Sequence, residues 1–133
     1  MRTLIILLSA ILVLSSCTKD SSKDAENSEL VTVNNLQEFD TKVSSGVSLV
    51  FFHATWCSKC AAQRPEVEAL IGDGELSHVF MAQVDFEKNP DIKNKYNVFG
   101  FPTILIIKDG DVRHTLTGQN NKREEIKTLL KAL

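Results

Sequence analysis

The sequence predicts an α/β domain in which a mixed, mostly parallel β-sheet is flanked by helices on both faces. From Leu30 onward, short apolar stretches alternate with segments of helical periodicity, which favours parallel strands joined by helices. Residues 47–54 are almost continuously apolar, as in a strand that is covered on both faces. Residues 108–111, Lys-Asp-Gly-Asp, indicate a hairpin turn, so the last strand is expected to add an antiparallel edge.

The elements are expected in the order β-α-β-α-β-α-β-β-α. Strands are predicted at residues 30–33, 47–54, 79–84, 103–107 and 112–117. The helices are expected to begin at a cap formed by Asn34 or Asn35, just after Cys57, at Asn89-Pro90, and at a cap formed by Asn120 or Asn121. Their inward residues are expected to be Leu36, Phe39 and Val43; Cys60, Ala61, Val67, Leu70 and Ile71; Ile92 and Tyr96; and Ile126, Leu129, Leu130 and Leu133.

Size and charge narrow the class of protein. A chain of 133 residues can form one domain with a real core and is too short for two comfortable ones. The formal net charge is −2, from 15 basic and 17 acidic side chains, so no basic surplus favours a nucleic-acid partner. Three cysteines are too few for a small secreted scaffold held by several disulfides, and the odd number gives one of them a separate role.

The first residues have the layout of a secretory signal. Arg2 precedes an apolar run at residues 4–14, which is shorter than the roughly 20 residues that a transmembrane helix needs. The ending Leu-Ser-Ser-Cys at residues 14–17 resembles the lipobox of bacterial lipoproteins. That resemblance implies that residues 1–16 are a signal peptide and that Cys17 carries the lipid. A plain signal peptide cut nearby and an uncleaved anchor are the alternatives.

This signal sets the expected organisation and location. Residues 17–29 comprise the lipidated cysteine and a stretch rich in Ser, Asp and Lys, which is predicted to be a disordered tether. Residues 30–133 are expected to form the domain. We expect this domain to be lipid-anchored to a membrane of the bacterial cell envelope and to face outside the cytoplasm, where disulfides persist.

Cys57 and Cys60 form a C-x-x-C at the predicted junction of a strand and a helix. The first turn of a helix has unpaired N–H groups and the positive end of the helix dipole, so a thiolate at Cys57 is stabilised and its pKa falls. Cys60 lies about one turn further on, so the two sulfurs can meet while Cys60 faces the interior. The expected mechanism is attack of Cys57 on a partner's disulfide, after which Cys60 attacks the Cys57 sulfur and releases the reduced partner.

The surroundings of the two cysteines leave several alternatives. Lys59 adds positive charge near the thiolate, or is a solvated lysine; Trp56 presents a flat apolar surface to a partner, or simply packs. A structural zinc site normally has four ligands, and His53, His78 and His114 are scattered, so we expect no metal, and nothing indicates a cofactor. A purely structural disulfide would close a loop too small to stabilise the fold much.

Two motifs resemble the thioredoxin superfamily. The motif WCSKC at residues 56–60, with Pro65 five residues later, is similar to its active site, and FGFPT at residues 99–103 is similar to the start of its next strand. The resemblance extends over residues 30–133 and implies a thioredoxin fold. It also implies a cis peptide bond before Pro102 and a substrate-binding role for Trp56, Phe101 and Pro102. Gly118 matches a further glycine of the family.

The sequence departs from the thioredoxin pattern between the cysteines and behind them. Ser58 and Lys59 stand where thioredoxins usually have Gly-Pro, a pair that helps to set the reduction potential in that family, so these residues are candidates for redox tuning. Phe51 stands where thioredoxins bury an aspartate, and Gln83 matches the position of the lysine near it.

The loss of that aspartate leaves the base that assists Cys60 unidentified. His53 and Asp85 are the candidates from the sequence. The alternatives are that His53 caps the core near the site and that Asp85 ends a strand at the surface.

We therefore expect an extracytoplasmic thiol:disulfide oxidoreductase that acts on protein disulfide or dithiol substrates, favouring reduction. The stretch FHATWC is similar to membrane-anchored reductases of cytochrome c maturation, whose central insertion is absent here, and NVFGFPTILII is similar to the C-terminal domain of transmembrane disulfide reductases. Reduction outside the cytoplasm implies a transmembrane electron donor as a partner. A disulfide oxidant or isomerase for secreted proteins is one alternative, and a non-catalytic binding module on the same fold is another.

Overall fold

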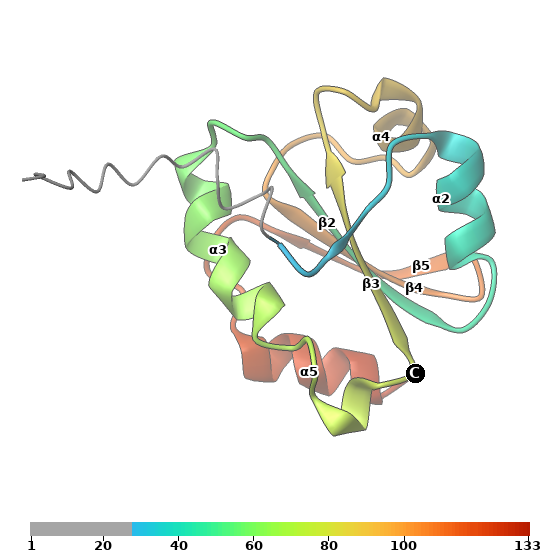
Figure 1. The fold of residues 1–133 in the computed structure, drawn as a ribbon, viewed down its shortest axis with the longest axis vertical. Coiled ribbons are helices and arrows are strands. Elements are labelled where there is room, and N and C mark those ends of the chain that lie inside the picture. Colours follow the sequence, from blue (N-terminus) through green and yellow to red (C-terminus); the bar gives the residue numbers. More distant parts are fainter. Residues whose placement is uncertain (1–27) are drawn as a thin grey trace, which may run out of the picture.

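Helices cover both faces of one five-stranded β-sheet in the computed structural model, which describes residues 28–133 (Figure 1). The strands are β1 (Val31–Thr32), β2 (Val47–His53), β3 (Val79–Asp85), β4 (Thr103–Lys108) and β5 (Asp111–Thr117). The helices are α2 (Leu36–Val43), α3 (Ser58–Glu68), α4 (Pro90–Lys95) and α5 (Arg123–Lys131), with a short 3-10 turn, η1 (Gly74–Leu76). In this range no helix is long and apolar enough to cross a bilayer. The predicted signal peptide, Cys17 and nearly all of the tether lie outside the described residues.

The sheet is mixed, as predicted, and its strand order is β1-β3-β2-β4-β5. β1 and β2 are both parallel to β3, whereas β4 is antiparallel to β2 and β5 to β4. One detail of the prediction was wrong: the first strand of the final hairpin, β4, is already antiparallel to β2, whereas only the last strand was expected to be antiparallel to its neighbour. The chain enters β4 at the end of the sheet where β3 finishes, because Thr103 lies opposite Phe52, which lies opposite Val84.

The side chains of the sheet divide into two apolar clusters, one on each face. Phe51 packs with residues of α3 and α5 on what we call the α3/α5 face. Phe52, the next residue, packs with residues of α2 and α4 on the α2/α4 face. This alternation follows from the pleat of the strand, and it explains why β2 is apolar at nearly every position. β2 lies between β3 and β4, so the strand that leads into Cys57 is central and buried.

Three predicted helix starts are confirmed, one of them at α4, where Asn89 is the N-cap residue and Pro90 follows it. Asn35 caps α2, with its side chain accepting from the backbone N–H of Glu38 at 2.8 Å. α3 begins at Ser58, directly after Cys57, which is the N-cap residue.

The predicted cap of the last helix was wrong. The N-cap of α5 is Lys122, whose side chain makes no capping bond, and the first helical N–H, that of Arg123, is accepted by Glu66 of α3 at 2.9 Å. Asn121 instead pairs with Gln63 of α3. The side-chain amide of Gln63 donates to the backbone carbonyl of Asn121 at 2.8 Å and accepts from the backbone N–H of Asn121 at 3.1 Å. Residues of α3 thus take over the capping role and hold the entry of α5 in place.

Candidate active site

Cys57 and Cys60 are joined by a disulfide at the N-terminus of α3, with their Cα atoms 5.2 Å apart. The Cys57 sulfur also accepts a hydrogen bond from the backbone N–H of Cys60 at 3.1 Å. Cys57 is 8% exposed and Cys60 is 2% exposed. The cysteine whose sulfur receives the helix N–H is therefore also the more exposed residue of the pair, which suits it for attack on an incoming disulfide.

An aromatic rim lies beside the disulfide. Trp56 is 66% exposed, and its indole N–H donates to the Glu87 carboxylate at 2.9 Å. The ring of Phe101 meets the Trp56 ring edge to face at 5.5 Å and the Phe86 ring at 5.0 Å. Phe101 also packs against the apolar cluster that contains both cysteines. The structure thus brings together two of the three predicted substrate-binding residues and adds Phe86 to them.

The third predicted substrate-binding residue, Pro102, follows a cis peptide bond, as the resemblance implied. Its carbonyl accepts from the N–H of Gly118 at 3.0 Å, and the Thr103 hydroxyl donates to the Gly100 carbonyl at 2.8 Å. Gly118 has φ of +83°, a conformation that favours glycine. A cavity of about 230 Å³ lies behind this loop, lined by residues 97–103 together with Thr115, Thr117 and Gly118.

The residues between the cysteines face solvent. Ser58 and Lys59 are both exposed, and in the described part of the chain the Lys59 ammonium has no hydrogen bond or ion pair. These observations do not test whether Ser58 and Lys59 tune the reduction potential, so that role stays a prediction.

His53 is buried behind the site on the α3/α5 face. Its ring stacks on Phe51, with centroids 5.9 Å apart, and its Nδ1 has no hydrogen-bond partner among the described residues. Burial, and next the positive charge of Arg64, lower the pKa of His53 to about 4. The imidazole is therefore neutral at pH 7. Its role as a base for Cys60 stays a prediction.

Asp85 shapes the turn after β3. Its Oδ1 accepts from the backbone N–H groups of Glu87 at 3.0 Å and Lys88 at 3.1 Å, and its Oδ2 lies 3.7 Å from the Lys88 ammonium. This is the strand-end role that the sequence left open as the alternative. Asp85 lies in register with His53 on the neighbouring strand.

The sequence analysis missed Arg64, which is buried on α3. Its guanidinium donates to Oε1 of Gln83 at 2.9 Å and lies over the ring of Phe51, 5.1 Å from the centroid. Arg64 therefore contacts both Phe51 and Gln83, the residues that stand in place of the thioredoxin aspartate and lysine. A charged residue four positions after Cys60, on the inward stripe of the helix, was the signal that could have identified it.

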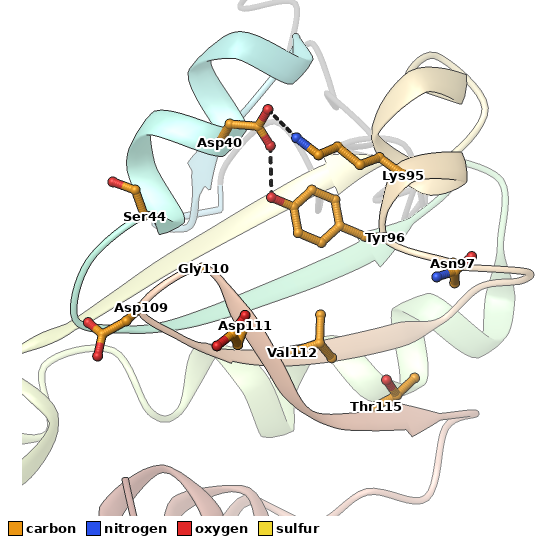
Figure 2. A pocket seen from close by; sticks show the side chains of 10 residues that line it. All are labelled: Asp40, Ser44, Lys95, Tyr96, Asn97, Asp109, Gly110, Asp111, Val112 and Thr115. Carbon is orange, nitrogen blue, oxygen red and sulfur yellow. Dashed lines mark hydrogen bonds and ion pairs between the residues drawn. The ribbon is translucent and has the colours of Figure 1, made fainter.

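A second cavity, of about 690 Å³, lies away from the cysteines between α2, α4 and the β4–β5 turn. Figure 2 shows that Asp40 contacts both the Lys95 ammonium and the Tyr96 hydroxyl at its edge. None of the predicted site residues lines this cavity. In residues 28–133, no group of three or more His, Cys, Asp or Glu side chains is placed to hold a metal ion.

The comparisons with known proteins agree with this geometry. The thioredoxin family model matches residues 30–132. The chain is 36% identical to thioredoxin from Staphylococcus epidermidis over 96 residues, which is 72% of this chain and 91% of that protein. Identity to Staphylococcus aureus thioredoxin is 38% over the same shares of both chains.

Solved structures give the same result. Oxidised mitochondrial thioredoxin 3 from Saccharomyces cerevisiae superposes with a TM-score of 0.68 at 25% identity, covering 85% of this chain and 99% of the yeast chain. Thioredoxin from Plasmodium falciparum gives a TM-score of 0.67 at 26% identity, covering 77% of this chain and 98% of that one. With its cysteine pair at the start of α3 and this likeness over the whole described domain, the chain belongs to the thioredoxin family and is a thiol:disulfide oxidoreductase.

Proposed function

We propose that this protein reduces disulfides of protein substrates outside the cytoplasm while its lipid anchor holds it at a membrane of the bacterial cell envelope. The observation that carries the exchange mechanism is the contrast between the two sulfurs. Cys57 is the more exposed of the two residues, at 8% against 2%, and its sulfur accepts a helix N–H. This arrangement favours attack by Cys57 and resolution by Cys60.

The exchange proceeds in two steps. The Cys57 thiolate attacks one sulfur of the substrate disulfide, a mixed disulfide forms, and the other substrate sulfur leaves as a thiolate that takes a proton from water. Cys60 then loses its proton and attacks the Cys57 sulfur, which breaks the mixed disulfide and releases the second substrate thiol. Two electrons have then passed to the substrate, and the protein ends with the Cys57–Cys60 disulfide.

The aromatic rim supports a protein substrate. Trp56 is exposed beside the disulfide, and its contacts with Glu87 and Phe101 hold it in place. A large aromatic surface of this kind gains free energy when an extended segment of another protein covers it.

The N-terminal residues support the location. An apolar run at residues 4–14 followed by Cys17 is typical of a lipoprotein signal. In a compartment where oxidised thiols are not reduced by the cytoplasmic pool, the disulfide left after each cycle needs a new supply of electrons. We therefore propose a transmembrane dithiol donor as the partner that reduces Cys57–Cys60.

The reduction potential of Cys57–Cys60 tests the direction of electron flow. The protein is equilibrated against dithiothreitol or glutathione, and the fraction of disulfide is measured. Thioredoxin has a reduction potential of about −270 mV, and a value near it supports a reductase. The strong oxidant DsbA has a potential of about −120 mV, and a value near that one makes this protein a disulfide donor. Failure to form a reversible disulfide contradicts both and favours a binding module.

Labelling of cells with a radioactive fatty acid tests the anchor. The wild-type protein is expected to carry the label and to sediment with membranes, and Cys17→Ser is expected to lose the label. Label on the Cys17→Ser protein, or no label on the wild type, contradicts the proposed lipidation.

A further inference from the structure

A charged side chain is buried on the α3/α5 face, one helical turn beyond Cys60. Arg64 is 5% exposed, and a guanidinium in such a position needs partners because an unpaired buried charge is strongly unfavourable. Its Nη1 donates to the Glu68 carboxylate at 3.2 Å and to Oε1 of Gln83 at 2.9 Å. The carbon of the guanidinium lies 5.1 Å from the centre of the Phe51 ring.

These partners neutralise the charge incompletely. The Glu68 side chain is 34% exposed and that of Arg64 is 6% exposed, so water screens the carboxylate more than the guanidinium. Gln83 carries no charge, and Phe51 offers only the electron-rich face of its ring. A net positive potential therefore remains on the inner side of Arg64.

Cys60 lies within reach of this potential. Residues four apart on a helix have Cβ atoms about 5–6 Å apart on the same side, and both Cys60 and Arg64 are buried on the inner side of α3. Phe51 belongs to the same apolar cluster as Cys60 and lies beneath the guanidinium. A buried charge acts on the groups around it more strongly in this weakly polar interior than in water.

Few other ionisable groups face Cys60 from the elements packed against it. β2 contributes His53, which is neutral at pH 7, and α3 contributes Glu68. At the end of β3, Asp85 is held by its turn and by Lys88. From α5, the buried side chains that join this cluster are Ile126 and Leu130.

We infer that Arg64 is a positioning residue for the second step of the exchange. The positive charge of its guanidinium stabilises the Cys60 thiolate, and this stabilisation takes the place of a buried base. This inference rests on the proposed exchange through Cys57 and Cys60. The Cys60 thiol gives its proton to water, and the thiolate gives an electron pair to the Cys57 sulfur. The new S–S bond forms as the bond between Cys57 and the substrate sulfur breaks, and the substrate leaves as a thiolate that takes a proton from water.

The same charge also acts on the redox equilibrium. At a pH at which part of Cys60 is ionised, it stabilises the thiolate of the reduced protein and has no such effect on the uncharged sulfurs of the disulfide. Arg64 therefore favours the reduced protein, and removal of its charge is expected to favour the disulfide. Removal of the counter-charge at Glu68 is expected to act in the opposite direction.

Three substitutions test this inference: Arg64→Met, Glu68→Gln and Arg64→Lys. Each is made in the full chain and purified in detergent. The chain also carries Cys17→Ser, so that Cys57 and Cys60 are the only thiols. In Arg64→Met the charge is lost at similar side-chain length. The equilibrium constant against dithiothreitol, measured at a pH at which part of Cys60 is thiolate, is expected to move roughly three- to tenfold toward the disulfide. A tenfold change corresponds to about 30 mV for this two-electron couple. Glu68→Gln is expected to move the constant toward the dithiol, and Arg64→Lys to stay near the wild type.

Two further readouts separate tuning from packing. The pKa of the Cys60 thiol, followed by NMR of its carbon-13-labelled Cβ, is expected to rise in Arg64→Met and to fall in Glu68→Gln. The rate at which a trapped mixed disulfide is resolved at pH 7 is expected to fall in Arg64→Met. Arg123→Met, which removes an exposed arginine paired with Glu124, is the matched control and is expected to change none of these quantities.

The outcomes distinguish this inference from the proposed function. If the wild type forms no reversible disulfide, the proposed exchange fails and the inference fails with it. If the wild type exchanges normally but both Arg64→Met and Glu68→Gln leave the potential and the Cys60 pKa unchanged, or move them in the same direction, the inference alone is overturned. If Arg64→Met does not fold, the sign of the Glu68→Gln shift still decides.

Discussion

The two faces of the sheet are packed from the same strands but carry different chemistry. On the α2/α4 face the cluster is made of apolar side chains such as Phe39 and Phe52, and the ion pair of Asp40 lies at its edge. On the α3/α5 face an equally apolar cluster contains the disulfide, and Arg64 and His53 are buried beside it. Both faces therefore contribute apolar packing to stability, whereas the thiol chemistry depends on the α3/α5 face alone.

The difference has a physical cause. Apolar packing stabilises a fold without regard to the protonation of any group. A buried charge or a buried neutral imidazole acts over several ångströms because little water screens it. Substitutions on the α2/α4 face should therefore change the free energy of unfolding and leave the redox properties alone, and those on the α3/α5 face should change both.

The largest effect is expected from Cys60→Ser. The first step of the exchange remains possible, because Cys57 is unchanged at the start of α3, but no thiol can resolve the mixed disulfide. Reduction of a protein disulfide such as that of insulin is expected to fall to the background rate. A covalent complex with the substrate should appear on non-reducing gels.

Cys57→Ser is the matched control for that experiment. It is expected to lose turnover as well, but without forming the complex, because the accessible sulfur is absent. Turnover that survives in either variant would contradict the assignment of the two cysteines.

Phe39→Ala tests the α2/α4 face. Phe39 is fully buried, with ring contacts to Phe52 at 6.3 Å and Tyr96 at 4.6 Å, so truncation is expected to lower the free energy of unfolding by about 3–5 kcal/mol. Urea unfolding followed by circular dichroism measures this loss. The milder Phe39→Leu provides a folded variant if the alanine protein is too unstable. A change of the Cys57–Cys60 reduction potential in either variant would break the separation of the two faces.

His53→Phe tests the α3/α5 face through pH. The folded-state pKa of His53 is lowered to about 4 by burial and by Arg64, below the value near 6.5 in the unfolded chain. Between these values the unfolded chain binds a proton that the folded protein does not. Stability should therefore fall as the pH drops through this window, by on the order of 1–3 kcal/mol.

Urea unfolding of the oxidised protein at pH 7 and pH 5 measures that slope. His53→Phe is expected to remove the contribution of this histidine, whereas His78→Gln, at an exposed histidine, should retain it. If the free energy of unfolding of His53→Phe falls between pH 7 and pH 5 by as much as in the wild type, the buried imidazole does not control this pH dependence.

The smallest effect is expected from Asp40→Asn at the edge of the α2/α4 face. The carboxylate lies 2.6 Å from the Lys95 ammonium and accepts from the Tyr96 hydroxyl at 2.8 Å, in a partly exposed position, so about 0.5–1 kcal/mol should be lost at pH 7. The hydrogen bond from Lys95 lowers the pKa of Asp40 below its usual 3.8. The stabilisation is therefore present above that value and is lost as the pH falls through the lower folded-state pKa.

Unfolding curves of wild type and Asp40→Asn should accordingly converge at the acid end of the pH range. Asp111→Asn, an exposed position at the start of β5, is the matched comparison and should follow the wild type throughout. If the free energies of unfolding of wild type and Asp40→Asn still differ by the same amount in acid, the stabilisation by Asp40 is not ionic.

The candidate site was predictable where its signals are local. A C-x-x-C after an apolar run identifies both the cysteines and the start of α3, because the end of a strand, the N-terminus of a helix and the spacing of the thiols are all set within a few residues. Arg64 was missed because its partner Gln83 is 19 residues away and on another element. The Trp56–Glu87 bond spans 31 residues and was missed for the same reason.

The sequence by itself determined the order of the elements, the inward residues of most of them, and the position of the cysteine pair at a strand–helix junction. These follow from periodicity and from local capping, which depend on neighbours along the chain. Only the tertiary structure decided that β4 runs antiparallel to β2, that Glu66 accepts the first helical N–H of α5, and that Arg64 is buried. Each of these depends on groups distant in the chain that meet only when the sheet is formed, and no local pattern records such a meeting.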